Sequence, residues 1–389
     1  MIYLDNGATT QPLPIVAETM MKVMLEDYGN PSSYHTMGLT AEKHIKQASE
    51  YFSKVLQCTP DEIIYTSGGT EANNMAIIGT ALAYNRTGKR IITTKIEHAS
   101  VHEAFKYLEE QGFEVIYLSV DARGYIDLDE LVSSINDETT LVSIMHVNNE
   151  LGTVQDIKAI GQKIKEKNKN TLFHVDGIQS FTKVQINRRS SQIDLLSVSS
   201  HKIYGPKGVG LLYKNKNTKM NALLFGGGQQ KGYRSGTQNV PGIVGMHIAA
   251  QEIMGRFDEH AATISALKQD LANSTLSTIE GTYINGPKVQ DGAPHILNIG
   301  FENIKAEVLL HALEAAKIYV SSGSACSSNK KVTNSVLQAI GKNKEQLDQA
   351  IRFSFGINNT QDQMDETVLV LQKTIPMLRQ VLSLGGRRR

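Results

Sequence analysis

Two residues near the middle of the chain are placed so that they could do chemistry together. Asp176 follows the apolar run Thr171–Val175, and Lys202 follows the run Asp194–Val198 after two serines and a histidine. If both runs are strands of a parallel sheet, their carboxyl ends open onto one crevice. An acid facing a lysine suits pyridoxal phosphate chemistry, in which the lysine holds the cofactor and the acid keeps its ring nitrogen protonated. The same pair would also fit a strand-end salt bridge.

Other polar residues follow predicted strands in the same way. His98 comes shortly after Ile91–Lys95, and Asn149 comes shortly after Leu141–Met145. A glycine turn at Gly68–Thr70 links a strand to a helix, and backbone N–H groups at such a turn can bind an anion. The glycine motif is weak alone, because it also begins ordinary helices. Together these positions predict one polar crevice at the sheet edge.

A cysteine and an arginine stand out in the last quarter of the chain. Cys326 lies in a run of small and polar residues from Ser321 to Lys331, which predicts an exposed loop. Two nearby lysines favour the reactive thiolate, although an incidental surface thiol is the plain alternative. Arg352 lies on the predicted strand Ala350–Phe355, where it could hold a carboxylate with its planar fork or form a salt bridge.

Strands and helices alternate over most of the chain, which predicts an α/β fold with a largely parallel sheet. We expect one helix at Thr40–Leu56 and a strand at Gly208–Tyr213 that turns back. A change of pattern near Gly255 divides the chain. We therefore predict a large domain over residues 15–254 and a small α/β domain over 255–389, joined by segment 1–14.

Composition limits the classes of function. The 389 residues are 40% hydrophobic and 20% charged, and the net charge of +1 favours neither nucleic acid nor an anionic membrane as a partner. We expect no membrane span and no secretion signal. Two cysteines are too few for a disulfide framework, which fits a reducing cytoplasm, and without paired cysteines we expect no metal site.

Four motifs in order, H-V-D-G-I-Q-S, S-S-H-K-I-Y-G-P-K-G, R-S-G-T and S-S-G-S-A-C-S-S, resemble those of the cysteine desulfurases. The likeness runs from Tyr3 to about Leu378. These NifS/IscS-like proteins are class V aminotransferases of the fold-type I pyridoxal phosphate enzymes. The resemblance implies an aspartate-aminotransferase-like fold, with a mostly parallel seven-stranded sheet in a large domain and a small α/β domain beside it.

The resemblance also implies roles for individual residues. Lys202, His98 and Cys326 would be catalytic, and Asn149 and Arg352 would bind the substrate. Pyridoxal 5′-phosphate would be held by residues on several strand ends and by one threonine that reaches across from a second subunit. This cofactor-binding set is Gly69, Thr70, His98, Asn149, Asp176, Gln179, Ser199, His201, Lys202 and, from the partner, Thr237.

The implied reaction converts L-cysteine to L-alanine and leaves a persulfide on Cys326. A homodimer would pass this sulfur to a protein acceptor, either an iron–sulfur scaffold or a tRNA thiolation enzyme. The end of the chain, Leu382–Arg389, lacks the aromatic-containing tail typical of the iron–sulfur group. Two alternatives stay open, namely a selenocysteine lyase or other pyridoxal phosphate lyase or aminotransferase of this fold, and a non-catalytic assembly scaffold.

Overall fold

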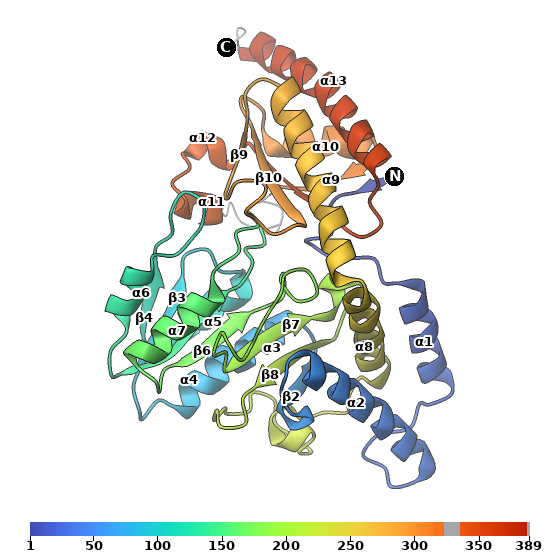
Figure 1. Ribbon diagram of the computed structural model, residues 1–389, viewed down its shortest axis with the longest axis vertical. Helices are drawn as coiled ribbons and strands as arrows, with labels where there is room; N and C mark the ends of the chain where they lie inside the picture. The colour runs from blue at the N-terminus through green and yellow to red at the C-terminus, as the bar shows by residue number, and fades with distance from the viewer. Residues whose placement is uncertain (323–334, 387–389) are drawn as a thin grey trace.

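The computed structural model describes residues 1–322 and 335–386. Its elements form two parts, one around a seven-stranded sheet and one around a four-stranded sheet (Figure 1). Two features of the sequence, Cys326 and the basic run Arg387–Arg389, lie outside the described residues.

The seven-stranded sheet is mostly parallel, as predicted. Strand β8 runs antiparallel to both of its neighbours, and the other pairings are parallel. The four strands β5 to β8 are buried along their whole length, because helices cover both faces of the sheet. In spatial order the strands are β2 (Ile63–Thr66), β8 (Gly210–Lys214), β7 (Leu195–Ser199), β6 (Leu172–Asp176), β5 (Thr139–Met145), β3 (Arg90–Thr94) and β4 (Glu114–Leu118).

Two hydrophobic cores lie on the two faces of this sheet. On one face, α2 (Thr36–Val55), α6 (Leu128–Ser134), α7 (Ile157–Lys167) and α8 (Val240–Gly255) supply the apolar side chains. On the other, the core comes from α5 (Ala99–Glu110) and from a helical stretch made of α3 (Gly69–Asn74), a π-helical turn (Met75–Gly79) and α4 (Thr80–Ala83). The result is a three-layer α/β/α arrangement that fixes where the strands end.

The second part has an antiparallel sheet in the order β12 (Ser321–Ser322), β13 (Ala350–Ser354), β10 (Ile296–Phe301) and β9 (Thr282–Ile284). Its core includes residues from three helices, α9 (Phe257–Thr278), α10 (Ala306–Ala315) and α13 (Gln361–Gly386). Helices α9 and α13 pack side by side along this sheet (Figure 1). Two short helices, α11 (Ser335–Ala339) and α12 (Lys344–Leu347), complete it.

The start of the chain connects the two parts. Strand β1 (Ile2–Tyr3) pairs in parallel with β11 (Ile318–Tyr319), and Leu4 lies in the core of the four-stranded part. After a crossing at residues 4–10, which we call the N-terminal segment, α1 (Pro14–Leu25) packs against α8. We propose that the boundary between the two domains lies between residues 254 and 255.

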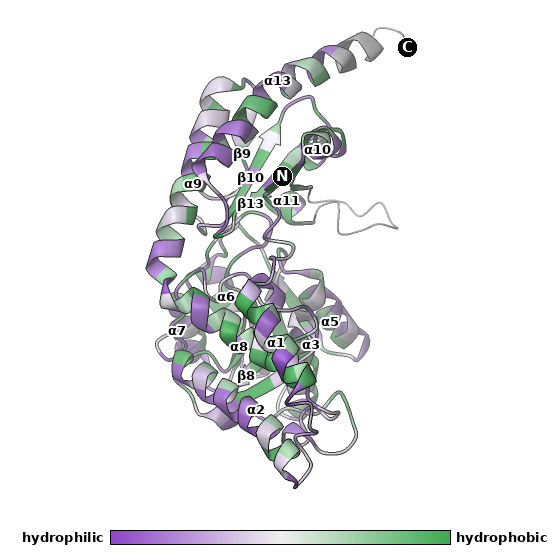
Figure 2. Ribbon diagram, turned by 90° about the vertical axis from the view of Figure 1, so that its right-hand side faces the viewer, coloured by the Kyte–Doolittle hydropathy of each residue, from purple (hydrophilic) through white to green (hydrophobic). Residues whose placement is uncertain are grey.

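The long helices of the second part have two kinds of surface. Helices α9 and α13 alternate between hydrophilic and hydrophobic residues along their length (Figure 2). This is the pattern of a helix with one face on a core and one in water. Within residues 1–322 and 335–386, no helix is both long and apolar enough to cross a membrane.

Candidate active site

The carboxyl ends of β3, β5, β6 and β7 meet at one edge of the large sheet. Asp176 ends β6 and lies in register with Met145 on β5 and Ser197 on β7. His98 follows β3 and Lys202 follows β7. The structure therefore brings together the strand-end residues on which the sequence argument depended.

Asp176 is buried and held by hydrogen bonds on both carboxylate oxygens. Its Oδ1 accepts from the backbone N–H of Ile178 at 2.9 Å, and its Oδ2 accepts from Asn73 Nδ2 at 2.8 Å. Burial raises the pKa of Asp176, while these bonds and the charges of His98 and Lys202 act against the rise. The carboxylate is thus fixed in place at the bottom of the crevice.

His98 is joined to Asp176 through two intermediate side chains. Its Nδ1 accepts from the backbone N–H of Ser100 at 3.1 Å, and in the neutral ring this puts the proton on Nε2. Ser100 Oγ bonds His98 Nδ1 at 2.9 Å and accepts from Asn73 Nδ2 at 2.9 Å. His98 is exposed as a residue, but desolvation of its ring lowers the pKa of His98. The charge of Asp176 acts against this shift, and the charges of Lys202 and Arg352 add to it. We call Asn73, His98, Ser100 and Asp176 the strand-end network.

Lys202 is anchored to the N-terminal segment. Its Nζ donates to the carbonyl oxygen of Gly7 at 2.7 Å and to that of Ala8 at 2.6 Å. Gln179 Nε2 donates to the same Gly7 oxygen at 2.9 Å, and Gln179 Oε1 bonds His295 Nε2 at 3.3 Å. The backbone of residues 7 and 8 therefore sets where the reactive amine lies.

A cavity of about 410 Å³ lies beside the N-terminal segment, with Ala8 and Thr9 in its lining. Four predicted cofactor-binding residues line it, and they are Gly69, Thr70, Ser199 and His201. A Cβ at Gly69 would lie 2.2 Å from Cδ1 of Ile178, so a side chain there would clash with Ile178. Ser199 Oγ is buried without a hydrogen-bond partner among the described residues, and an anion that accepts hydrogen bonds would satisfy it.

His201 is bound to the N-terminal segment as well. Its Nδ1 lies 3.2 Å from Thr9 Oγ1, and its carbonyl oxygen accepts from Thr10. Burial lowers the pKa of His201 to about 4, and the neighbouring lysines 202 and 207 strengthen the shift. The ring is therefore neutral near pH 7 and can donate one hydrogen bond to an anion without carrying charge.

Arg352 approaches the crevice from β13 of the other part. Its guanidinium donates from Nη2 to Asp5 Oδ1 and from Nη1 to the carbonyl oxygen of Asn149, both at 3.0 Å. Glu150 Oε1 lies 3.8 Å from Nη1. The two predicted substrate-binding residues, Arg352 and Asn149, are thus in contact, and both touch acidic neighbours.

The remaining predicted residues lie elsewhere. Thr237 is exposed and does not line the cavity of its own chain. Cys326 belongs to the part of the chain that the structure does not describe. Cys58 is half-buried against the core, and burial raises the pKa of its thiol to about 11, which makes it a poor nucleophile.

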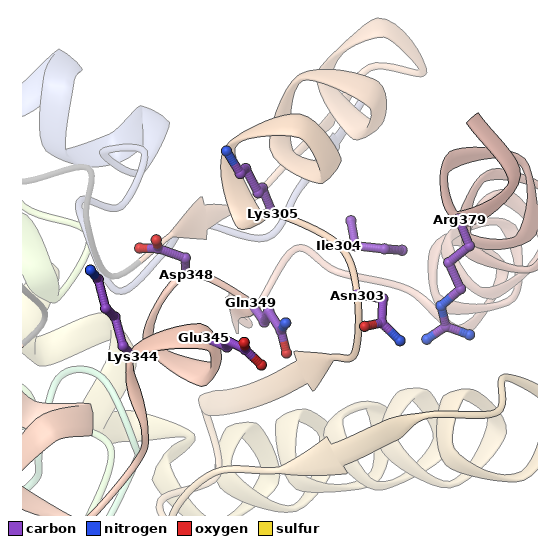
Figure 3. Close-up of a pocket in the computed structure, with 8 residues that line it drawn as sticks. All are labelled: Asn303, Ile304, Lys305, Lys344, Glu345, Asp348, Gln349 and Arg379. Atoms are coloured by element: carbon purple, nitrogen blue, oxygen red, sulfur yellow. The ribbon is translucent and has the colours of Figure 1, made fainter. Parts of the chain in front are cut away.

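A second cavity has no part in this site. It measures about 690 Å³ and lies in the second part of the molecule (Figure 3). Figure 3 shows Lys305, Lys344 and Arg379 around it together with Glu345 and Asp348, a mixture of signs. The Arg379 guanidinium is already bonded to three backbone carbonyls. Within the described chain, no group of three His, Cys, Asp or Glu side chains is arranged to hold a metal ion.

Sequence reasoning missed several residues of the site. Asn73 and Ser100 connect Asp176 to His98, Asp5 pairs with Arg352, and His295 contacts Gln179. Asn73 had a readable signal, because it lies one helical turn after Gly69 on the side that faces the strands. For Asp5 and His295 no pattern in the sequence pointed to their partners, which are far away along the chain.

Comparison with known proteins finds relatives over nearly the whole chain. Residues 2–367 match the family described as aminotransferase class-V. The cysteine desulfurase IscS of Pseudoalteromonas translucida is 43% identical over 385 residues, covering 98% of this chain and 94% of that protein. A solved NifS-like protein is 38% identical with a TM-score of 0.91, covering 97% of this chain and 100% of that one. A structure of SspA in complex with cysteine is 34% identical with a TM-score of 0.80, covering 92% and 100%.

Proposed function

The chain belongs to the class-V aminotransferase family and, within it, to the cysteine desulfurases, and on this premise we propose that it takes the sulfur from L-cysteine and releases L-alanine. The observation that carries the proposal is the convergence of Asp176, His98 and the Lys202 amine at the carboxyl edge of one sheet. The relatives named cysteine desulfurase support the choice of substrate.

The crevice suits pyridoxal 5′-phosphate. When bound, this cofactor supplies an aldehyde for a lysine amine and a ring that withdraws electrons from the substrate α-carbon. Lys202 would hold it covalently, and the fixed carboxylate of Asp176 would face its ring nitrogen. His98 and Gln179 would contact the ring and its oxygen. The cavity with the unpartnered Ser199 hydroxyl would take the phosphate, together with Gly69, Thr70 and His201.

The chain's own residues would then divide the work on the substrate. Arg352 and Asn149 bind the α-carboxylate, and the Lys202 amine moves the proton at the α-carbon. The thiolate of Cys326 attacks the substrate sulfur, so that an S–S bond forms while the carbon–sulfur bond breaks. The carbon takes up a proton and leaves as L-alanine, and the persulfide stays on Cys326.

We further propose that the protein works as a homodimer in the cytoplasm. Apolar side chains are exposed on α1 and just after it, among them Ile15, Met24, Leu25 and Tyr34, the last being 98% exposed. Such a patch is typical of an interface between chains. Thr237 is exposed and does not line the cavity of its own chain, which fits a role in the cavity of a partner subunit. The sulfur acceptor is an iron–sulfur scaffold or a tRNA thiolation enzyme.

Mass spectrometry after incubation with L-cysteine tests the function. We expect the mass of one added sulfur atom on the peptide that contains Cys326, and L-alanine in solution. In Cys326→Ser both should fall to background, while Cys58→Ser should behave as wild type because the Cys58 thiol is packed on the core. Added sulfur on the Cys58 peptide, or full L-alanine release by Cys326→Ser, would contradict the proposal.

A further inference from the structure

The guanidinium of Arg352 is already engaged by a carboxylate of its own chain. The Arg352 side chain is 5% exposed, and its Nη2 donates to Asp5 Oδ1 at 3.0 Å. Its Nη1 donates to the Asn149 carbonyl oxygen at 3.0 Å. A carboxylate grips arginine best through two parallel N–H bonds. A substrate carboxylate that takes both of these nitrogens must therefore compete with Asp5.

Two acidic side chains lie beside this arginine, and they differ in how easily they can leave. Glu150 is 11% exposed and lies 3.8 Å from Nη1, outside hydrogen-bond distance. The Asp5 side chain is 22% exposed, and only its backbone is fixed, by an isolated bridge to Ser354 on β13. Burial raises the pKa of both carboxyls, and Arg352 acts against the rise in both. Asp5 is the bonded partner and the more exposed of the two.

A buried guanidinium without an anion is strongly destabilised. Asp5 supplies that anion between catalytic cycles, and an arriving α-carboxylate can replace it at no net loss of ion pairing. Lys202 lies close enough to Asp5 to lower its pKa, so a displaced Asp5 carboxylate still has a cation nearby. The exchange of one carboxylate for another is therefore electrostatically balanced.

We propose that Asp5 is a specificity-determining residue whose carboxylate occupies the place on Arg352 that the α-carboxylate of an amino-acid substrate takes. The inference rests on the proposed function, because it needs Arg352 to bind substrate. A ligand then binds only when its other contacts outweigh the bond between Asp5 and Arg352. Simple carboxylates without an amino group are excluded, and amino acids that also engage the lysine side of the crevice are accepted.

Binding of L-alanine and propionate to the holoenzyme, measured by calorimetry, tests this inference. The two ligands differ only in the amino group, and neither contains sulfur to transfer. Asp5→Asn keeps the size of the side chain but turns a charged hydrogen bond into a weaker neutral one. We expect Asp5→Asn to bind L-alanine about tenfold more tightly than wild type does. It should also bind propionate at concentrations where wild type shows no binding.

The sign of the change separates this role from a structural one, because a folding defect lowers affinity and does not raise it. Asp5→Glu keeps the charge and should show no gain. Asp121→Asn is the matched control, since Asp121 also lies 3.0 Å from an arginine but on the surface. If Asp5→Asn does not fold, Asp5→Ser provides the same neutral test. Equal or weaker L-alanine binding by the folded neutral variant would overturn the inference.

Arg352→Gln distinguishes failure of the inference from failure of the proposed function. If Arg352→Gln loses L-alanine binding and Asp5→Asn gains none, only the role of Asp5 is wrong. If Arg352→Gln binds L-alanine as tightly as wild type, the proposed substrate site is wrong, and the role of Asp5 falls with it.

Discussion

The site has two halves that are built in different ways. The strand-end network is made of side chains that bond to one another, with Asn73 between Asp176 and Ser100. The N-terminal segment contributes mostly backbone, as the carbonyl oxygens of Gly7 and Ala8 hold the Lys202 amine. One half depends on residue identity and the other on the path of the chain. This difference decides which half a sequence reveals and how each half responds to mutation.

The largest effect should follow from breaking the strand-end network at its centre. Asp176→Asn keeps the shape of the side chain but removes the fixed negative charge at the bottom of the crevice. We expect kcat/KM for L-cysteine to fall by at least about 100-fold, the scale typical of a lost electrostatic partner at a reacting group. Steady-state kinetics measures this, with Asp121→Asn as the surface control. An activity within a few-fold of wild type would show that the network is only structural.

Acid should act with opposite signs on the strand ends of the large sheet and on the N-terminal segment. Burial lowers the pKa of His146, which follows β5, to about 4. An unfolded histidine titrates near 6.5, so the unfolded chain binds more protons between about pH 6.5 and pH 4, and stability falls as pH falls through that window. At about 1.4 kcal/mol per pKa unit, His146 alone should lower the free energy of unfolding by about 3 kcal/mol across this pH window.

The contribution of the N-terminal segment to the free energy of unfolding should change with pH in the opposite direction. Its one ionisable side chain is Asp5, whose pKa is raised by burial, so its contribution to stability increases as the carboxyl takes up a proton. Denaturant unfolding from pH 7 to pH 4 should show a shallower loss for His146→Asn than for wild type. His311→Asn, at an exposed histidine, should follow the wild-type curve. Equal slopes for all three proteins would contradict the assignment.

The smallest effect should come from the N-terminal segment. Ser354 Oγ accepts from the backbone N–H of Gly7 at 2.7 Å and donates to the Leu4 carbonyl oxygen. Ser354→Ala leaves this buried N–H without a partner, which we expect to cost about 1 to 2 kcal/mol. Hydrogen exchange should speed up at residues 4–10 and stay unchanged in β5 and β6. Faster exchange in both regions would show that the two halves are not separate.

Sequence patterns predicted the strand ends of the site, although they missed Asn73 and Ser100. Buried apolar runs mark β6 and β7, and a polar residue directly after each one is readable because parallel strands end at a common edge. The strand at Gly208–Tyr213 that turns back is confirmed as β8, at Gly210–Lys214. The predicted helix Thr40–Leu56 begins earlier, at Thr36, because the ring of His35 accepts from the Gly38 N–H, a cap that patterns do not anticipate.

The N-terminal half was hidden for a physical reason. A carbonyl oxygen that binds Lys202 is the same whatever the residue type, so Gly7 and Ala8 carry no chemical signal. Asp5 does carry one, but its partner Arg352 is 347 residues away and no periodicity connects them. The π-helical turn at Met75–Gly79 was likewise unreadable, since its apolar residues fit an ordinary helix equally well.

The bond between Gly7 and Ser354 also has a consequence for how the protein is made. Its two residues are 347 positions apart, so the first leaves the ribosome long before the second exists. Until β13 emerges, the Gly7 N–H and the Leu4 carbonyl oxygen lack their bonds to Ser354, and the cradle of the lysine that follows β7 is unfinished. The crevice therefore closes only late in translation, and the nascent chain stays inert until nearly all of it has been synthesised.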